Sequence, residues 1–438
     1  MTACATGGAV ASCSSDDDTR ESEPGDAGWE ASATTEDAAV LDGGAADASP
    51  VPVRDAAPFD GGPLPVVCAS APCAKSLVTT RAPTDFDRSQ GYCVLLDDGT
   101  VACWGANAAG QLGRGSDAGT ADSAIAERVV GLSDVAQLDH TCALDTSGAV
   151  WCWGTGPFLR NDAGAATTER TPLKLALPPA TRVGMGSDVG CAVVDDGVLC
   201  WGRNTSGVVA PFDVAASFSV LPPRAIGVPS GAPIRDIAVG KAVFVIREDG
   251  VTLSWGANPP LARVSSLSPD PQPLPIALGG ISSIDMTSDT ACATVAGIGY
   301  CWGQAIASPI YVRALPTPVV APEPIVRIAT TRSMFVAELG DSIVQPQRWC
   351  AVGASGSVYC WGNNASGQAG DGTKEYAFEA VKVEGLPEPA AEVKTTADTT
   401  CALLTNGKVF CWGANYYGQL GNGKMRVPSL VPQEVVLP

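Results

Sequence analysis

The sequence predicts an all-β protein in which seven similar antiparallel sheets form a closed ring. The main observation is a Trp-Gly pair that recurs at intervals of 47 to 59 residues, which marks an internal repeat. A hairpin pattern accompanies each pair. The first hairpin has no strand-like stretch before it, and the last such stretch has no hairpin after it, so the two ends of the array complement each other. The repeat is absent before residue 68. The seven pairs begin at Trp104, Trp153, Trp201, Trp255, Trp302, Trp361 and Trp412.

Each repeat unit contains a predicted β-hairpin. In the first unit, two short runs of Val, Leu and Ala flank the turn residues Asp97, Asp98 and Gly99. Glycine adopts a positive φ without steric cost, so Asp-Gly between apolar runs is a strong local hairpin signal. We therefore expect the Trp-Gly pair to end the second strand of each hairpin.

Paired cysteines set the register of these hairpins. Nine residues separate the two cysteines in four units, and eight separate them in two units. A three-residue turn in the first group, and a loop shortened to an even length in the second, place such cysteines directly opposite each other, at a separation that a disulfide accepts. In the fourth unit Phe244 and Ser254 replace both cysteines together, as bonded partners would be replaced. The alternative is reduced cysteines packed as small apolar residues. The predicted disulfides are Cys93–Cys103, Cys142–Cys152, Cys191–Cys200, Cys292–Cys301, Cys350–Cys360 and Cys401–Cys411.

Composition favours an extracytoplasmic array of short strands. Only 17% of the residues are charged, whereas the chain holds 49 glycines and 34 prolines, which suits many strands joined by turns. Sixteen cysteines without zinc-type Cys-x2-Cys runs indicate an oxidising compartment. His140 is the single histidine, which excludes chemistry built on several histidines. The pI near 4.4 and the lack of a basic patch argue against nucleic acid as a partner.

The N-terminal segment 1–13 resembles a truncated lipoprotein signal. Val10-Ala11-Ser12-Cys13 is similar to a bacterial lipobox, and the resemblance implies that Cys13 carries the lipid. Only twelve residues precede Cys13, and they include no Lys or Arg. The alternatives are a chance tetrapeptide and a bridge between Cys4 and Cys13.

Residues 14–66 are predicted to form a disordered acidic tether. They hold thirteen acidic residues against two arginines and little apolar surface to bury, so charge repulsion extends them. Calcium binding by Asp16, Asp17 and Asp18 is a weaker alternative to a solvated acidic run. Cys68 and Cys73 then begin the folded part, 67–438. We expect them to form a small structural bridge rather than a redox pair.

The ends of the repeat predict how the ring closes. A strand-like stretch, usually preceded by proline, follows each Trp-Gly pair. The last stretch, near Val435, has no hairpin after it, and the first hairpin has no such stretch before it. We therefore predict that the tail near Val435 joins the sheet that carries Trp104, which removes the open end of the array.

The repeat pattern resembles the regulator of chromosome condensation repeat family, in its bacterial, disulfide-bearing form. The resemblance rests on Cys-Ala-Leu-x-x-x-Gly-x-Val-x-Cys-Trp-Gly and on the ending Gly-Gln-Leu-Gly at 110–113 and 418–421. It spans residues 76–438 and implies a seven-bladed β-propeller closed by mixing N- and C-terminal strands. Units two to five depart from the ending. Each repeat tryptophan is expected to pack between blades with its N–H on a carbonyl, and the alternative is a row of ligand-stacking tryptophans.

The expected function is that of a binding scaffold. Eukaryotic members of the family include a nucleotide exchange factor for a small GTPase, but the disulfides, acidity and anchor argue against that role. We expect a cell-surface lipoprotein that recognises an extracellular protein or glycan through rim loops, without a cofactor and with only the lipid anchor in the membrane. The candidate contacts are Phe158 to Thr171, Asn258 to Pro275, Glu338 to Trp349, Tyr416 and Tyr417.

Two other functions are weighed against this one. An enzyme acting on a polysaccharide could use the paired carboxylates Asp97-Asp98 or Asp195-Asp196, but both pairs lie at predicted turns, where Asp favours the turn itself. We expect no catalytic residues and no metal site. A purely architectural envelope protein is the third possibility, and sequence patterns do not distinguish it from a scaffold.

Overall fold

The computed structural model describes residues 59–81, 88–117, 119–156, 167–195, 197–304, 312–338 and 341–438. Cys13, most of the predicted tether and Phe158 lie outside these residues. Within the described part of the chain, no helix has the length and apolar character needed to cross a membrane.

Seven four-stranded antiparallel sheets make up the fold, and each takes its strands from one stretch of the chain. The first strands are β1 (Ala74–Thr79), β5 (Val135–Asp139), β9 (Arg182–Met185), β13 (Ile234–Val239), β17 (Ser283–Met286), β21 (Ile325–Thr330) and β27 (Ala390–Thr395). The second strands are β2 (Gly91–Leu96), β6 (Cys142–Asp145), β10 (Val189–Val194), β14 (Ala242–Arg247), β18 (Thr290–Val295), β24 (Arg348–Gly353) and β28 (Thr399–Leu404).

The third and fourth strands complete each sheet. The third strands are β3 (Val101–Gly105), β7 (Val150–Gly156), β11 (Gly197–Arg203), β15 (Thr252–Gly256), β19 (Ile298–Gln304), β25 (Val358–Gly362) and β29 (Val409–Gly413). The outer strands are β4 (Ser123–Arg128), β8 (Thr167–Lys174), β12 (Val220–Ile226), β16 (Asp270–Pro275), β20 (Val312–Pro318), β26 (Ala377–Lys382) and β30 (Ser429–Glu434). An extra hairpin, β22 (Met334–Glu338) with β23 (Asp341–Gln345), is inserted between β21 and β24.

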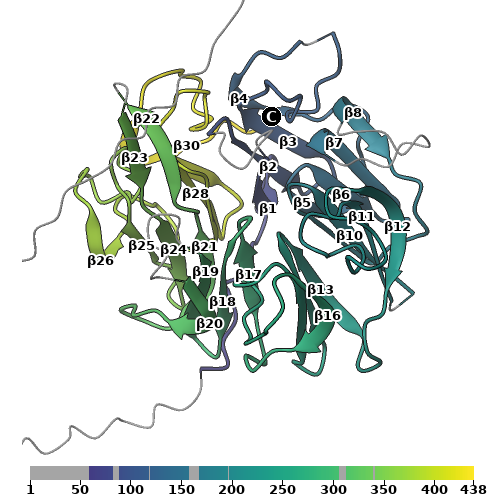
Figure 1. Ribbon diagram of the computed structural model, residues 1–438. Helices are drawn as coiled ribbons and strands as arrows, with labels where there is room; N and C mark the ends of the chain where they lie inside the picture. Colours follow the sequence, from purple (N-terminus) through teal and green to yellow (C-terminus); the bar gives the residue numbers. More distant parts are fainter. Residues whose placement is uncertain are drawn as a thin grey trace, which may run out of the picture. The chain divides into compact units, whose positions relative to one another are not determined.

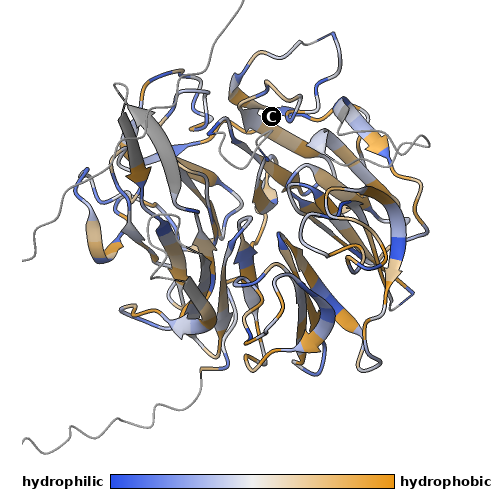
Figure 2. Cartoon of the chain, viewed as in Figure 1, coloured by the Kyte–Doolittle hydropathy of each residue, from blue (hydrophilic) through white to orange (hydrophobic). Residues whose placement is uncertain are grey.

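The sheets form a closed ring around their first strands. Each first strand contacts the first strand of the next sheet, and β27 contacts β1. This arrangement confirms the predicted seven-bladed β-propeller, whose blades surround the strands at the centre of Figure 1. Apolar residues concentrate along the strands, as the hydropathy colours show in Figure 2. Each apolar cluster of the core takes its residues from two neighbouring blades, so the core is a series of layers between blades rather than one central cluster.

The predicted closure by strand exchange is wrong. β30 pairs with β29 in the last blade, and β1 is the first strand of the first blade, paired with β2. β1 thus fills the position expected for the tail. The tail still reaches the first blade through side chains, because Val435 packs in the same apolar cluster as Trp104. The C-terminus accordingly lies near β3 and β4 in Figure 1.

The hairpin between the second and third strands sets the register of each blade. In the first blade Leu96 N–H donates to Thr100 O at 2.8 Å, which leaves a three-residue turn. Gly99 takes a φ of 76° in that turn, a conformation that suits glycine. In the fifth blade Val295 pairs with Ile298, so the turn has two residues. These lengths place the two cysteines of each hairpin directly opposite each other.

Six blades carry a disulfide between the second and third strands. The bonded Cα atoms are 4.1 Å apart in every one of these hairpins. Their sulfurs are buried between blades, as for Cys93 and Cys103, which are fully buried. Cys68 and Cys73 are also bonded, with Cα atoms 5.7 Å apart. Each hairpin bridge stabilises the chain by about 2.7 kcal/mol in the chain-entropy description.

The repeat tryptophans connect one blade to the preceding one. Six are buried and Trp361 is half-buried. For Trp201 and Trp361, the loops of the preceding blade, 157–166 and 305–311, lie outside the described residues. The indole N–H of the others donates to a backbone oxygen in the loop of the preceding blade: Trp104 to Gln419 at 2.8 Å, Trp153 to Gln111 at 2.8 Å, Trp255 to Val208 at 3.0 Å, Trp302 to Pro260 at 2.8 Å and Trp412 to Gln368 at 2.9 Å.

Residues from 59 onward contact the propeller. Phe59 packs against the apolar cluster that contains Trp412, and Val66 packs against the cluster that contains Trp104. Both residues fall in the range that the sequence assigned to the tether. Val67 N–H then donates to Thr405 O at 2.7 Å. These contacts hold the chain against the last blade before the Cys68–Cys73 bridge.

Candidate functional site at one end of the central channel

The connections from first to second strands all emerge at one end of the central channel. Five of them contain two or three residues, whereas those of the first and sixth blades, 80–90 and 331–347, contain eleven and seventeen. The seventh blade lies between these two in the ring and has a three-residue connection, 396–398. Both long connections contact this short one. Loops of this kind on a rigid scaffold are where binding residues concentrate.

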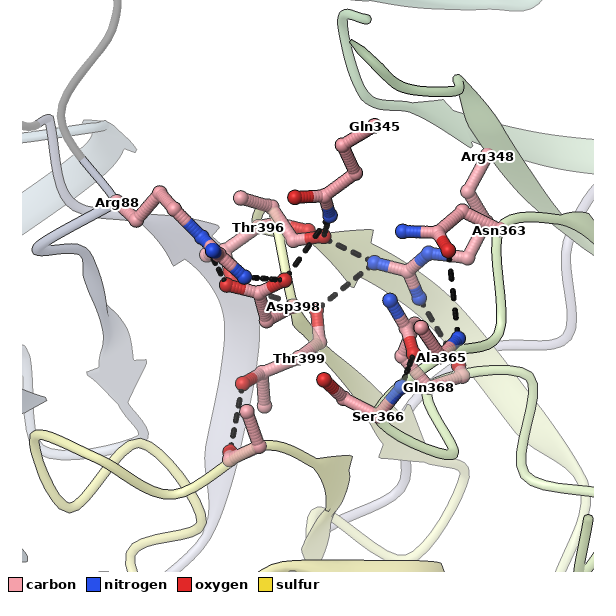
Figure 3. A network of polar contacts seen from close by, with 12 residues as sticks. Arg88, Gln345, Arg348, Asn363, Ala365, Ser366, Gln368, Thr396, Asp398 and Thr399 are labelled. Carbon is pink, nitrogen blue, oxygen red and sulfur yellow. Dashed lines mark hydrogen bonds and ion pairs between the residues drawn. The ribbon is translucent and has the colours of Figure 1, made fainter. Parts of the chain in front are cut away.

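Asp398 receives side chains from both neighbouring blades. Arg88 of the first blade forms a two-point ion pair with its carboxylate, with Nε 2.6 Å from Oδ2. Gln345, the last residue of β23, donates from Nε2 to Oδ1 at 3.0 Å and to Ala397 O at 3.1 Å. Figure 3 shows the three side chains converging. The Asp398 side chain is only 6% exposed, so water competes little for these contacts.

A buried arginine donates hydrogen bonds to the backbone of the same turn, 396–399. Arg348 is fully buried and donates to Thr396 O at 2.7 Å, Thr399 O at 3.2 Å and Gln368 O at 2.9 Å (Figure 3). It also contacts Thr400 Oγ1. Burial lowers the pKa of Arg348 to about 10, which leaves the guanidinium charged at neutral pH. The group therefore acts as a fixed set of donors for backbone carbonyls between blades six and seven.

Tyr92 binds the turn from the first blade. Its hydroxyl donates to Thr399 O at 2.8 Å, and its ring stacks on Trp104 with centroids 5.8 Å apart. Burial raises the pKa of the Tyr92 phenol, so the hydroxyl stays a donor. Ala397 N–H donates to Gln90 Oε1 at 3.3 Å on the same side. The turn 396–399 is thus held from both sides by its neighbours.

Charged side chains also line the channel. Lys394 Nζ lies 2.7 Å from Asp285 Oδ1, which joins blades seven and five. Burial opposes the charge on Lys394, but the carboxylates of Asp285, Glu392 and Asp139 together outweigh it, and the pKa of Lys394 is raised. Burial raises the pKa of Asp139, whose Oδ2 accepts from Met185 N–H at 2.7 Å. Burial, followed by the charge of Arg81, holds the pKa of His140 well below its usual range.

No group of three or more His, Cys, Asp or Glu side chains in the described ranges could hold a metal ion. The paired aspartates lie at turns. Asp98 is bound by Thr100 and Arg128, which lower its pKa to about 2. Asp195 sits at a two-residue turn with a φ of 48°, and Asp196 lies outside the described residues. A carboxylate with a pKa of about 2 cannot serve as a general acid at neutral pH.

The predicted binding residues lie in different blades. Tyr416, in the loop after β29, is 61% exposed, and Tyr417 beside it is half-buried. Trp349 is half-buried at the start of β24 and stacks on Trp361, with centroids 6.2 Å apart. Phe212, Val214 and Phe218 expose apolar side chains in a loop that lies outside the predicted ranges.

Sequence reasoning found the insertion in the sixth unit but missed the residues that bind the last blade. The range 338–349 contains Gln345 and Arg348, but sequence reasoning singles out only the aromatic Trp349 in it. A charge at position 348 was the available signal, since the equivalent positions hold Gly91, Ala242 or Thr399. Arg88 and Asp398 are 310 residues apart, and no local pattern connects them.

These features define a seven-bladed β-propeller. Models of the regulator of chromosome condensation (RCC1) repeat match residues 138–159, 392–419 and 406–438. The matches fall on the second and seventh blades. The second blade contains Cys142 and Cys152, and the seventh contains the ending Gly-Gln-Leu-Gly.

Curated relatives include a receptor and a ligase. The ultraviolet-B receptor UVR8 of Arabidopsis thaliana is 27% identical over 359 residues, which cover 76% of this chain and 77% of the receptor. The E3 ubiquitin-protein ligase HERC2 of Homo sapiens is 28% identical over 197 residues, covering 41% of this chain but 4% of the ligase. The second likeness therefore concerns only a small part of a much longer protein.

Solved structures share the architecture. Prp20p of Saccharomyces cerevisiae superposes with a TM-score of 0.60 at 18% identity, covering 81% of this chain and 89% of its own. Human WBSCR16 superposes with a TM-score of 0.59 at 17% identity, covering 78% of this chain and 94% of its own. At these identities the likeness establishes the fold alone.

Proposed function

We propose that this protein is a binding scaffold that recognises another protein through the channel end where the two long connections meet the seventh blade. The observation that carries the proposal is the convergence of Arg88 and Gln345 on Asp398. Such a network fixes the two connections relative to each other, and a preformed surface loses little entropy on binding. Prp20p is described as having binding properties toward Gsp1p and histones, so a propeller of this architecture can present a protein-binding surface.

We further propose that the protein works outside the cytoplasm, at a bacterial cell surface. Six buried hairpin disulfides support this, because such bonds persist in oxidising compartments and are rare in the cytosol. The lipobox-like Val10 to Cys13 supports a lipid anchor at Cys13. Fatty-acid labelling that is lost in Cys13→Ser would support the anchor, and equal labelling of both proteins would exclude it.

The partner-binding surface is tested by shortening one long connection. We replace residues 332–346 by a three-residue turn and use as control the removal of residues 212–217, the mostly exposed part of the loop after β11 in the third blade. Affinity capture from the surface fraction of the source cells compares both variants with the parent. We expect the first variant to retain at least tenfold less partner and the control to retain all of it. Equal capture by the three proteins would refute the proposed surface.

The class of partner is tested in the same experiment. A protein partner is expected as one stoichiometric band that survives glycosidase treatment. Capture that disappears after glycosidase treatment would indicate a glycan. Release of soluble sugar from a polysaccharide by the purified chain would instead indicate an enzyme, and would contradict the scaffold proposal.

A further inference from the structure

A polar cavity of about 100 Å³ lies beside the candidate site at the same end of the channel. Its walls are the ends of the first strands and the turns that follow them, from six of the seven blades. It shares Gln90, Thr396 and Ala397 with the candidate site. Because the first strands are innermost, the cavity lies close to the axis of the ring, where every blade faces inward.

The size of the cavity restricts its ligand. Cavities of about 150 Å³ bind benzene, which has six non-hydrogen atoms, whereas sites for drug-sized molecules measure about 300 to 1,000 Å³. A space of about 100 Å³ therefore accepts a group of four or five non-hydrogen atoms. Carboxylate and phosphate groups are of this size, and a sugar ring is not.

Hydroxyl groups dominate the walls, and two of them are left without partners. Ser288 and Thr395 both line the cavity and are 5% and 8% exposed. Among the residues that the structure describes, Ser288 Oγ and Thr395 Oγ1 make no hydrogen bond. A buried hydroxyl without a partner is unfavourable. Both oxygens have almost no exposed surface, so each hydroxyl must rotate toward the cavity to donate to a ligand there.

The charges around the cavity favour an anion. Arg81 and Arg332 both line it, and the single carboxylate of the wall, Asp285, is bound by Lys394 at 2.7 Å. Arg332 also pairs with Asp289, behind the wall, at 3.4 Å, and Lys241 lies 3.9 Å from the same Asp289 oxygen, so two cations share that carboxylate. Asp285 Oδ2 also accepts from Thr330 N–H at 3.0 Å, so its charge is directed at these partners. Guanidinium groups and hydroxyls together are the donors that bind carboxylates and phosphates in proteins.

We propose that this cavity binds a small oxyanion, a carboxylate or phosphate group, in contact with Ser288, Thr395 and the guanidinium of Arg332. The anion could be free in solution or be part of a partner, and both sources present the same oxygens. The proposal does not depend on the protein-binding surface proposed above. Binding would join blades five, six and seven through one group at the axis.

The single histidine provides a direct measurement. His140 lines the cavity, with Nδ1 2.9 Å from Thr79 O, and its imidazole gives one set of proton resonances in the full chain without a tag. We titrate the chain with acetate and with inorganic phosphate, and use chloride at equal ionic strength as reference. We expect a saturable shift of the His140 resonances and a raised pKa of His140, because an anion opposes the effect of Arg81 and Lys394.

Variants locate the site. Arg332→Gln should weaken binding at least tenfold, and Ser288→Ala and Thr395→Val should each weaken it severalfold without changing a charge. Arg128→Gln, at an exposed ion pair on the first blade, is the matched control and should bind as the parent does. If Arg332→Gln does not fold, the two hydroxyl variants test the site without it. Unchanged binding in both hydroxyl variants would place the anion elsewhere and overturn the proposal.

The source of the anion is resolved by a third titration. A short peptide with a free C-terminal carboxylate is compared with its amidated form. Tighter binding of the carboxylate peptide than of acetate supports a partner's carboxylate as the ligand, and equal or weaker binding supports a free anion. A His140 shift that is linear and equal to that in chloride for every probe would show that the cavity holds only water, which overturns the proposal.

Discussion

Phe244 lies directly opposite Ser254 in the fourth blade, at the register that bonded cysteines occupy in the other six. Phe244 is fully buried and meets Trp302 of the next blade edge-on, with centroids 5.7 Å apart. Ser254 Oγ donates to Leu261 O at 2.6 Å. In this blade an aromatic contact and a buried hydrogen bond therefore occupy the space that a disulfide fills elsewhere.

The first prediction concerns a seventh disulfide. In the double variant Phe244→Cys, Ser254→Cys, we expect a disulfide to form between the two new cysteines, because β14 and β15 have the register of the bonded hairpins. The bridge contributes about 2.8 kcal/mol, whereas loss of a buried phenylalanine costs about 3 to 5 and loss of the serine hydrogen bond about 1 kcal/mol. The oxidised variant should thus be about 1 to 3 kcal/mol less stable than the parent in urea unfolding.

Two observations check this reasoning. A free-thiol assay should find no reactive thiol at the two positions before reduction. An oxidised variant that is more stable than the parent would show that the contact between Phe244 and Trp302 contributes less than its burial indicates.

The hairpins and the number of blades could be predicted because their signals are local. Asp-Gly turns and the spacing of cysteines lie within about a dozen residues, so they fix register without knowledge of the ring. The indole hydrogen bonds follow from the repeat as well, since the acceptor Gln111 of Trp153 recurs as Gln368 for Trp412 and as Gln419 for Trp104.

The closure was mispredicted because the first strands carry no such signal. β1 (Ala74–Thr79) has neither a turn motif nor a cysteine, so no pattern in the sequence distinguishes it from the residues around it. The proline-preceded stretches taken as evidence of a missing strand belong to outer strands, such as β12 and β16. Proline is tolerated there because the outer edge has no ladder partner. No local sequence pattern predicts the candidate site, because its contacts join residues of the first blade to residues of the last.

The second prediction concerns the buried arginine. Arg348→Met should lower the free energy of unfolding by about 2 to 3 kcal/mol, since Thr396 O loses its donor and charged hydrogen bonds are lost. Arg348→Lys should recover part of this loss, because an ammonium reaches fewer of the same carbonyls. Urea unfolding measures both variants. Arg128→Met is the exposed control and should stay within about 0.5 kcal/mol, and a loss as large as that of Arg348→Met would refute the argument.

The third prediction is a coupling energy across the candidate site. A double-mutant cycle with Arg88→Met and Asp398→Asn should give a coupling of about 1 to 2 kcal/mol, because the carboxylate is nearly buried while the arginine is 32% exposed. The matched pair Arg128 and Asp98, 45% and 46% exposed, should give less than about 1 kcal/mol. Raising the salt concentration should weaken the second coupling more than the first. Equal couplings with equal salt dependence would mean that burial does not distinguish the two pairs.

The fourth prediction is a dependence of stability on pH through His140. Burial and the charge of Arg81 lower the pKa of His140 well below 6.5, so the native state binds fewer protons than the unfolded chain and loses stability as pH falls through this range.

Between about pH 7.5 and 5.5 this loss reaches at most about 1.4 kcal/mol. His140→Asn should remove it, because asparagine cannot titrate, can replace the Nδ1 hydrogen bond to Thr79 O and tolerates the φ of 51° at this position. The raised pKa of Asp139 has the opposite effect on stability. The native state binds this proton more tightly than the unfolded chain does, so stability falls as pH rises. The parent and the variant share this contribution. Urea unfolding of parent and variant at three pH values isolates the histidine. Parallel pH profiles of the two proteins would show that His140 titrates normally in the folded state.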